Sequence, residues 1–187
     1  MKMREPFLIR ELLDPAECRT CQLAMDAGAH SEAAVLEGDG VQVDPARRAG
    51  DVDVAPEVLG LVETRLDRRL VDVARHFGLA LTGREGSGFV RYPPGGFYRR
   101  HVDRAKSRAW PAAARRRVSA VIFLNAARGD GTEGEFEGGV LRLYPSTRDV
   151  IEIVPRRGLL VAFSATMPHE VTVVTGGVRD AVVDWYY

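Results

Sequence analysis

The second half of the chain is a succession of short runs with strand character, and this feature limits the possible folds most. The runs are rich in β-branched and aromatic residues and are separated by Gly, Pro, Asn, Asp or Ser. They cover residues 89–92, 118–124, 140–144, 150–154, 159–163, 171–174 and 181–187. Because no helical periodicity lies between them, we expect these strands to close as a sandwich or jelly roll.

The first half of the chain predicts two helices, with a short strand in residues 7–13 before the first. Asp14, Pro15 and Glu17 form a capping-box pattern that starts the first helix, and Gly28 ends it. Its apolar face should contain Ala16, Leu23, Ala24 and Ala27, with Cys18 and Cys21 packed beside it or at its edge. Two weak strands are expected near residues 33–36 and 41–43.

The second helix is predicted from apolar residues that recur at intervals of three and four, and Gly78 ends it. These residues are Leu59, Val62, Leu66, Leu70, Val73 and Phe77. We expect both helices to pack outside one sheet. The predicted fold class is therefore mainly β with flanking N-terminal helices, and the 187 residues suit one domain. Residues 1–84 would form a helical support region and residues 85–187 the jelly-roll core.

Composition indicates an ordinary globular protein in a reducing compartment. The 26 basic and 26 acidic residues leave no net charge, and no stretch approaches a membrane span, so membrane and nucleic-acid partners are not expected. Cys18 and Cys21 are too few for a disulfide framework or a zinc site, and we interpret them as reduced thiols of a cytoplasmic protein.

A basic segment, residues 99–117, contains eight arginines and lysines against the single acid Asp103. A glycine-rich, acidic segment follows at residues 129–139. Both are expected to be loops. Charge runs are commonly just solvated, while the alternative for the basic segment is that it borders an active-site mouth and helps to hold a substrate.

His101-x-Asp103 is the part of the sequence that most suggests chemistry. On an extended strand, residues two apart project from the same face, so this imidazole and carboxylate can bind one metal ion together. His169, in Pro-His-Glu-Val, can supply a third ligand, and two histidines with one carboxylate form the facial triad of non-haem Fe(II) oxygenases. Arg179, ten residues further on, is suited to bind a carboxylate bidentately.

These residues resemble the 2-oxoglutarate and Fe(II)-dependent dioxygenases, and among them the prolyl 4-hydroxylases, particularly the hypoxia-sensing enzymes and their bacterial relatives. The resemblance covers about residues 89–187. It is carried by Tyr98-Arg-Arg-His101-Val-Asp103, Phe123-Leu-Asn125, Gly138-Gly139-Val-Leu-Arg-Leu-Tyr-Pro145, Pro155, Phe163-Ser164, Pro168-His169-Glu170-Val171, Arg179 and Trp185-Tyr186.

The resemblance implies a double-stranded β-helix of the jelly-roll, cupin-like type. It also implies Fe(II) bound by His101, Asp103 and His169, 2-oxoglutarate paired through its distal carboxylate with Arg179, and O2 as the oxidant. Ascorbate is left open as a further cofactor. Oxidative decarboxylation of 2-oxoglutarate to succinate and CO2 would be coupled to hydroxylation of the substrate.

Two positions depart from the hypoxia-sensing enzymes. Phe123 stands where those enzymes have a tyrosine whose hydroxyl helps to bind the co-substrate, and Val183 stands where they have a threonine. The missing hydroxyl could come from Tyr98, Tyr92 or Ser119, which we predict as cofactor-binding residues.

The expected substrate is a proline in a protein or peptide. The nearest alternative is the same chemistry on a small molecule, such as a free amino acid or a biosynthetic intermediate. A non-catalytic jelly-roll binding domain is a second alternative, against which the intact set of ligands and arginine argues. A nucleic-acid demethylase has only the basic segment in its favour.

Overall fold

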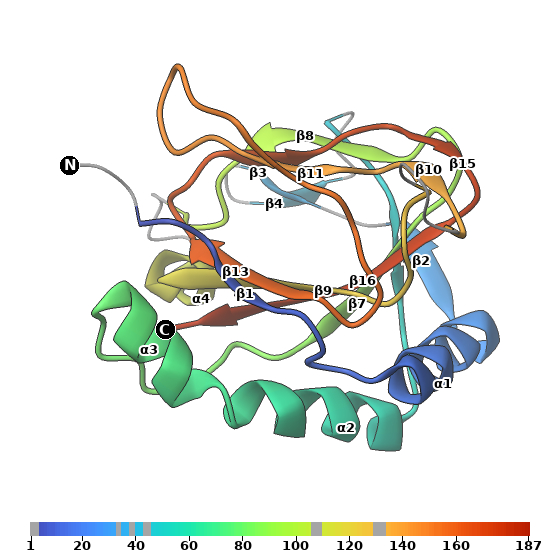
Figure 1. Ribbon diagram of the computed structural model, residues 1–187, viewed down its shortest axis with the longest axis horizontal. Helices are drawn as coiled ribbons and strands as arrows, with labels where there is room; N and C mark the ends of the chain where they lie inside the picture. Colours follow the sequence, from blue (N-terminus) through green and yellow to red (C-terminus); the bar gives the residue numbers. More distant parts are fainter. Residues whose placement is uncertain (1–3, 33–34, 38–39, 43–45, 106–109, 129–133) are drawn as a thin grey trace.

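The computed structural model describes residues 4–32, 35–37, 40–42, 46–105, 110–128 and 134–187, and within them two antiparallel sheets face each other (Figure 1). Three helices cover the outer face of the larger sheet (Figure 1). They are α1 (Pro15–Ala27), α2 (Pro56–Asp67) and α3 (Leu70–Phe77), and a short α4 (Pro111–Arg115) lies within the strand-rich half. This is the predicted double-stranded β-helix with flanking N-terminal helices.

The larger sheet has seven strands in the order β1-β13-β9-β16-β7-β6-β2. Their bounds are β1 Phe7–Ile9, β13 Leu160–Ser164, β9 Val118–Phe123, β16 Arg179–Tyr186, β7 Gly88–Tyr92, β6 Gly50–Val52 and β2 His30–Glu32. The central strands β9 and β16 are paired over six residues, from Ala181 opposite Phe123 to Tyr186 opposite Val118. Strand β16 therefore runs through the middle of the molecule, with β7 on its other side.

The smaller sheet has five strands in the order β12-β11-β14-β8-β5. Their bounds are β12 Ile151–Ile153, β11 Leu141–Leu143, β14 His169–Val171, β8 Phe97–His101 and β5 Arg47–Arg48. Two further pairs lie apart from both sheets, β10 (Glu137–Gly138) with β15 (Val174–Gly176) and β3 (Val35–Glu37) with β4 (Gly40–Gln42).

Most of the predicted strands are present, with informative exceptions. The run at 171–174 was wrong as one strand, because β14 ends at Val171 and β15 begins at Val174. The expectation that no helix interrupts the strands was also wrong, since α4 begins at Pro111, a residue suited to a first helical turn. The described residues before 84 supply β1, β2, β5 and β6 to the two sheets, so this region contributes strands as well as helices.

Helix α1 begins as predicted but turns a different face to the sheet. Asp14 accepts a hydrogen bond from the backbone of Glu17, and the Glu17 carboxylate accepts one from the backbone of Asp14. The buried residues are Cys18, Cys21 and Met25, whereas Leu23 is 60% exposed, so the predicted alanine and leucine face was wrong. Cys18, Cys21 and Met25 belong instead to the cluster that packs on the larger sheet, and all three are residue types that are often fully buried.

The predicted second helix is in fact two helices, α2 and α3, with a break at Arg68 and Arg69. The Arg69 N–H bonds to the Leu66 carbonyl, three residues back, which tightens the turn and redirects the chain. The apolar residues of both helices still lie on the side that faces the sheet, because one tighter turn changes the direction of the side chains only slightly. Gly78 ends α3 in the left-handed conformation, with φ 63°, as expected for such a cap.

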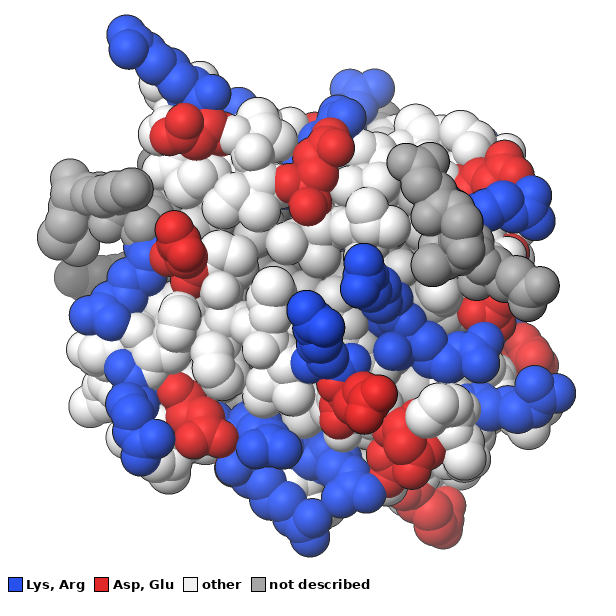
Figure 2. Space-filling model, in the orientation of Figure 1, with Lys and Arg blue, Asp and Glu red and all other residues white. Residues whose placement is uncertain are grey.

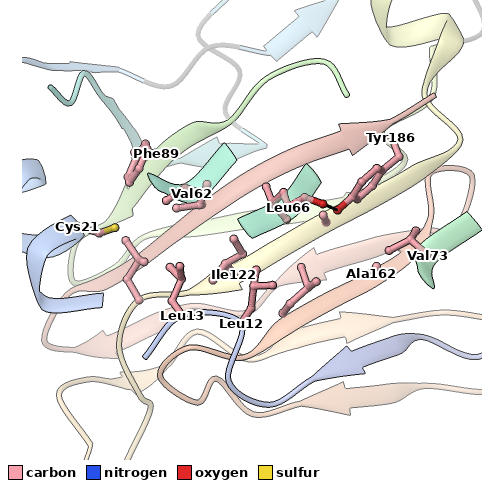
Figure 3. Packing of buried hydrophobic residues seen from close by; sticks show 14 of the residues in the cluster. Leu12, Leu13, Cys21, Val62, Leu66, Val73, Phe89, Ile122, Ala162 and Tyr186 are labelled. Carbon is pink, nitrogen blue, oxygen red and sulfur yellow. Dashed lines mark hydrogen bonds between the residues drawn. The ribbon is translucent and has the colours of Figure 1, made fainter. Parts of the chain in front are cut away.

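The main core lies between these helices and the larger sheet (Figure 3). Val62 and Leu66 of α2 and Val73 of α3 pack onto Ile122 and Ala162 of the sheet. A fully buried aliphatic side chain of this kind contributes roughly 1.5–3 kcal/mol. The Tyr186 hydroxyl donates to the Leu66 carbonyl at 3.1 Å, so the last strand is also tied to α2 by a hydrogen bond (Figure 3).

On the face that Figure 2 shows, basic and acidic side chains lie interspersed, as the balanced composition predicts. Among the described residues, no helix has the length and apolar character needed to cross a membrane.

The two cysteines should be nearly inert in the folded protein. Both are 0% exposed, and burial raises the pKa of Cys18 to about 11 and that of Cys21 to about 12. A pKa of about 11 in place of 9.0 lowers the thiolate fraction at pH 8 about a hundredfold. We therefore expect a disulfide reagent to label the native protein very slowly and the protein in guanidinium chloride at once. Fast labelling under native conditions would contradict the burial of α1.

Candidate active site

His101 and His169 face each other across two paired strands of the smaller sheet. His101 is the last residue of β8 and His169 the first of β14, and the two are direct partners in the pairing. The register then shifts, because Val171 pairs with Tyr98, three residues before His101. This bulge brings Tyr98 and His101 onto one face, although regular alternation would put residues three apart on opposite faces.

Asp103 joins the two histidines from just beyond the end of β8. Its Oδ1 lies 3.4 Å from Nε2 of His101, and its Oδ2 lies 3.5 Å from Nε2 of His169. The strand ends at His101, so the expectation that strand alternation places His101 and Asp103 was wrong, although the two side chains do meet. The atoms of these three residues that could bind a metal, one from each, lie within 4.8 Å of one another.

The hydrogen bonds of the two imidazoles leave their inner nitrogens as acceptors. Nδ1 of His101 lies 2.8 Å from the Arg99 carbonyl, and Nδ1 of His169 lies 3.0 Å from the Met167 carbonyl. A carbonyl only accepts, so each neutral ring carries its hydrogen on Nδ1 and a lone pair on Nε2. Two nitrogen lone pairs then point at a carboxylate, an arrangement that a bound cation satisfies.

Electrostatics keep His169 and Asp103 in the states that a metal requires. Burial lowers the pKa of His169 to about 4, so this imidazole is neutral at physiological pH. Burial alone would raise the pKa of Asp103. The opposing effects of His169, His101 and a hydrogen bond from Ser119 are together larger, so the pKa lies well below its ordinary value. An ionised carboxylate and a neutral imidazole are the metal-binding forms of these residues. The residues therefore fit a divalent metal of the facial-triad type.

Aromatic rings hold both imidazoles in place. The Tyr98 ring stacks on His101 with centroids 3.5 Å apart and planes at 18°. The Phe163 ring packs on His169 in a T-shaped arrangement, with centroids 4.7 Å apart and planes at 65°. Because each Nδ1 is also bonded to a backbone carbonyl, neither ring can rotate without losing a hydrogen bond and a ring contact.

Arg179, the first residue of β16, is a buried cation at the inner end of the same space. It is 2% exposed, and its guanidinium lies over the rings of Tyr92 at 4.8 Å and Phe123 at 5.2 Å. Its Nε has no hydrogen-bond partner among the described residues. Burial lowers its pKa from the ordinary value, although a guanidinium remains charged at neutral pH. Its neighbour Asp180 is bound to Arg91. The arrangement fits an incoming carboxylate.

The predicted cofactor-binding residues lie in different parts of the site. Tyr92 is next to Arg179, being its partner in the pairing of β7 with β16. Tyr98 lies against His101 instead, and the Ser119 hydroxyl donates to Oδ2 of Asp103 at 2.6 Å. Of the three candidates, Tyr92 is therefore the one placed to provide a hydroxyl beside the buried arginine.

A cavity of about 740 Å³ joins these groups between the two sheets. His101, Asp103, His169, Arg179, Tyr92 and Tyr98 all line it. The cavity is also lined by Trp110 and α4 of the basic segment, by Trp185, and by Ala46 and Arg47 before and in β5. Sequence reasoning offered the basic segment as one alternative but did not place Trp185, Ala46 or Arg47 at the site. Trp110 within the basic segment and Trp185 in the last strand were the available signal, whereas the region near Ala46 has no pattern to reveal it.

The basic segment is partly structural. Arg116 is paired with Glu85 at 2.6 Å, lies 3.6 Å from the Trp185 ring centre and donates to the Asp103 carbonyl at 3.3 Å. Arg104 donates to the Ala114 carbonyl. Lys106 and Arg108 lie outside the described residues, as do residues 129–133 of the acidic segment, whose described part contains the short strand β10. Within the described part, the segment thus borders the cavity through α4, as one of the two interpretations expected.

Divalent metal should stabilise the folded protein, since the site is assembled only there. With Mn²⁺ at a hundred times its dissociation constant, we expect about 2.7 kcal/mol of added stability, seen as a higher melting temperature. His169→Ala should abolish this response. His76→Ala is the matched control, because His76 lies on α3 beside Phe7 and should leave the metal response unchanged. Equal stabilisation of the His169 variant would refute the ligand assignment.

Comparison with known proteins gives relatives of one kind. A PKHD-type hydroxylase from Picosynechococcus sp. is 34% identical over 97 residues, which are 52% of this chain and 39% of the relative, so the chain spans well under half of that protein. A prolyl-4-hydroxylase from Pseudomonas putida aligns over 98% of this chain and 92% of its own, with 25% identity and a TM-score of 0.74.

A second solved structure shares the fold. It is a prolyl hydroxylase from Trichoplax adhaerens in complex with a peptide fragment of the hypoxia inducible factor oxygen degradation domain. The alignment covers 97% of this chain and 83% of that one, with 23% identity and a TM-score of 0.78. The family model described as 2OG-Fe(II) oxygenase superfamily matches residues 87–187, more than half of the chain and all four of the residues singled out as ligands and anchor. The chain belongs to the 2OG-Fe(II) oxygenase superfamily.

Proposed function

We propose that this protein is an Fe(II)- and 2-oxoglutarate-dependent dioxygenase that hydroxylates a proline residue of a protein or peptide. The observation that carries the proposal is the meeting, in one cavity, of three side chains that could bind a metal and a buried arginine whose Nε has no hydrogen-bond partner among the described residues. Membership of the superfamily supplies the identity of the metal and the co-substrate.

His101, Asp103 and His169 would hold Fe(II), and Arg179 would bind the distal carboxylate of 2-oxoglutarate. The Tyr92 hydroxyl would help to bind the co-substrate, because Phe123 and Val183 have no hydroxyl to do so. When bound, Fe(II) and 2-oxoglutarate use O2 to convert a C–H bond to C–OH, with release of succinate and CO2. The protein's own residues position the reactants and line the cavity around them.

The cavity suits a co-substrate and a substrate side chain together. About 740 Å³ lies within the range of sites that enclose a small molecule, and Trp110 and Trp185 contribute aromatic side chains to its lining. A pyrrolidine ring is compact and apolar, so such a wall favours it. The likeness to the Pseudomonas putida prolyl-4-hydroxylase supports a prolyl substrate.

The remaining parts of the proposal concern organisation and location. We assign residues 85–187 as the catalytic core and residues 1–84 as its support, because the described part of the latter packs helices and strands around the larger sheet. A cytoplasmic location is supported by two buried thiols that are not joined in a disulfide.

The direct test is incubation with Fe(II), 2-oxoglutarate, ascorbate and a library of proline-containing peptides. We expect succinate release that depends on Fe(II), and a mass gain of one oxygen on proline. Succinate release with free amino acids or small metabolites, but never with peptides, would favour the small-molecule alternative. No succinate under any condition would favour a non-catalytic domain.

Gly139→Ala should weaken 2-oxoglutarate binding. Gly139 has φ +60°, and an added Cβ would lie 2.8 Å from Cδ of Arg179 and 3.0 Å from Cε2 of Phe136. The left-handed backbone costs an L-residue about 1–2 kcal/mol, and the clash displaces the guanidinium. We expect the KM for 2-oxoglutarate to rise about tenfold or more, which corresponds to about 1.4 kcal/mol.

Gly176→Ala is the matched control for this prediction. Gly176 lies in β15, has no positive φ, and an added Cβ would meet its nearest atom at 3.6 Å, an ordinary contact. Its KM for 2-oxoglutarate should equal that of the wild type. An unchanged KM in the Gly139 variant would argue against Arg179 as the co-substrate anchor.

A further inference from the structure

Asp103 differs from the two histidines in how its backbone is held. His101 and His169 are strand residues that pair with each other, so the sheet fixes both. Asp103 lies in a bend after β8 has ended. Its N–H bonds to the Ala165 carbonyl at 3.1 Å and its carbonyl accepts from Arg116 at 3.3 Å, but neither contact fixes the rotation of the carboxylate.

Ser119 is the residue that holds the carboxylate itself. Its hydroxyl donates to Oδ2 of Asp103 at 2.6 Å, a short bond of the kind a charged acceptor gives. Ser119 is 2% exposed and lies in β9, the central strand, between Phe163 of β13 and Trp185 of β16. The donor is therefore attached to a rigid part of the fold.

We propose that Ser119 is a positioning residue for the metal site, which fixes the Asp103 carboxylate so that one oxygen is held by the hydroxyl and the other is presented to the metal. The inference rests on the proposed function, because it assumes that Asp103 is a ligand. It replaces the expectation that Ser119 contacts 2-oxoglutarate, since its hydroxyl is already used by Asp103 and it does not line the cavity.

The chemistry requires a hydroxyl at this position. An ionised carboxylate accepts hydrogen bonds and cannot donate them, and a serine hydroxyl is a small donor that rotates to reach it. Without the donor, the carboxylate would rotate about its Cβ–Cγ bond. Metal binding would then have to order it, which makes the free energy of binding less favourable. Partners that orient metal ligands typically change metal affinity by 10–100-fold when they are removed.

The test is titration of metal-free protein with Mn²⁺ alone, without co-substrate or turnover, for the wild type, Ser119→Ala and Ser119→Thr. We expect the dissociation constant of the alanine variant to rise about 10–100-fold and that of the threonine variant, which keeps a hydroxyl, to stay near the wild-type value. Melting curves of the metal-free proteins verify that each variant is folded.

Ser87→Ala is the control for the loss of a buried serine–carboxylate bond as such. The Ser87 hydroxyl donates to Oδ2 of Asp184 at 2.8 Å, the same kind of bond. Asp184 is next to Trp185 in β16 and therefore points to the opposite face of the larger sheet, away from the metal site. The Ser87 variant should lose some stability and none of its Mn²⁺ affinity.

The outcomes separate this inference from the proposed function. A wild-type protein that binds no Mn²⁺ would overturn both. A wild type that binds Mn²⁺ with the same affinity as Ser119→Ala would overturn the role of Ser119 alone, as would a threonine variant as weak as the alanine variant, or an equal loss in Ser87→Ala.

Discussion

The pairing of β8 with β14 is the constraint on which the whole site depends. It sets His101 opposite His169, and its bulge turns Tyr98 to the same face, so that one stretch of irregular ladder positions two imidazoles and the ring that braces one of them. Asp103 then has only two residues of chain in which to reach the same point. Ser119 of the larger sheet donates a hydrogen bond to its carboxylate. A site made from one sheet is thus completed by the other.

The site holds two local charge imbalances of opposite sign. At the metal position, acceptors face acceptors, while at the inner end a guanidinium is buried against rings with its Nε unbonded. Each arrangement is costly alone, since buried polar groups without partners lose the hydration they had in water. The two lie in one cavity, so a divalent cation bound at the first and a ligand carboxylate bound at the second would relieve both. Preorganised charge of this kind requires no rearrangement when the ligand arrives.

Much of the fold and the identities of the site residues could be predicted, because both depend on local patterns. Strand runs, the capping box at Asp14 and the cap at Gly78 follow from residue type alone. What could not be predicted depends on contacts between distant segments. The bulge in β8, the buried Cys18 face of α1 and the link from Ser119 to Asp103 are all set by which strand or helix lies alongside. The Ser119 hydroxyl was noticed in the sequence, but its partner was not.

The two faces of the larger sheet pack against different parts of the molecule. One face is covered by the helices in a dense core, whereas the other faces the smaller sheet, where a second buried cluster shares Val121 and Leu141 with the lining of the cavity. Both clusters stabilise the fold, whereas α4, which lines the cavity, contributes a residue to neither of them. Such a scaffold can exchange its outer wall during evolution while it keeps the same metal chemistry, which gives a physical route to new substrates without a new fold.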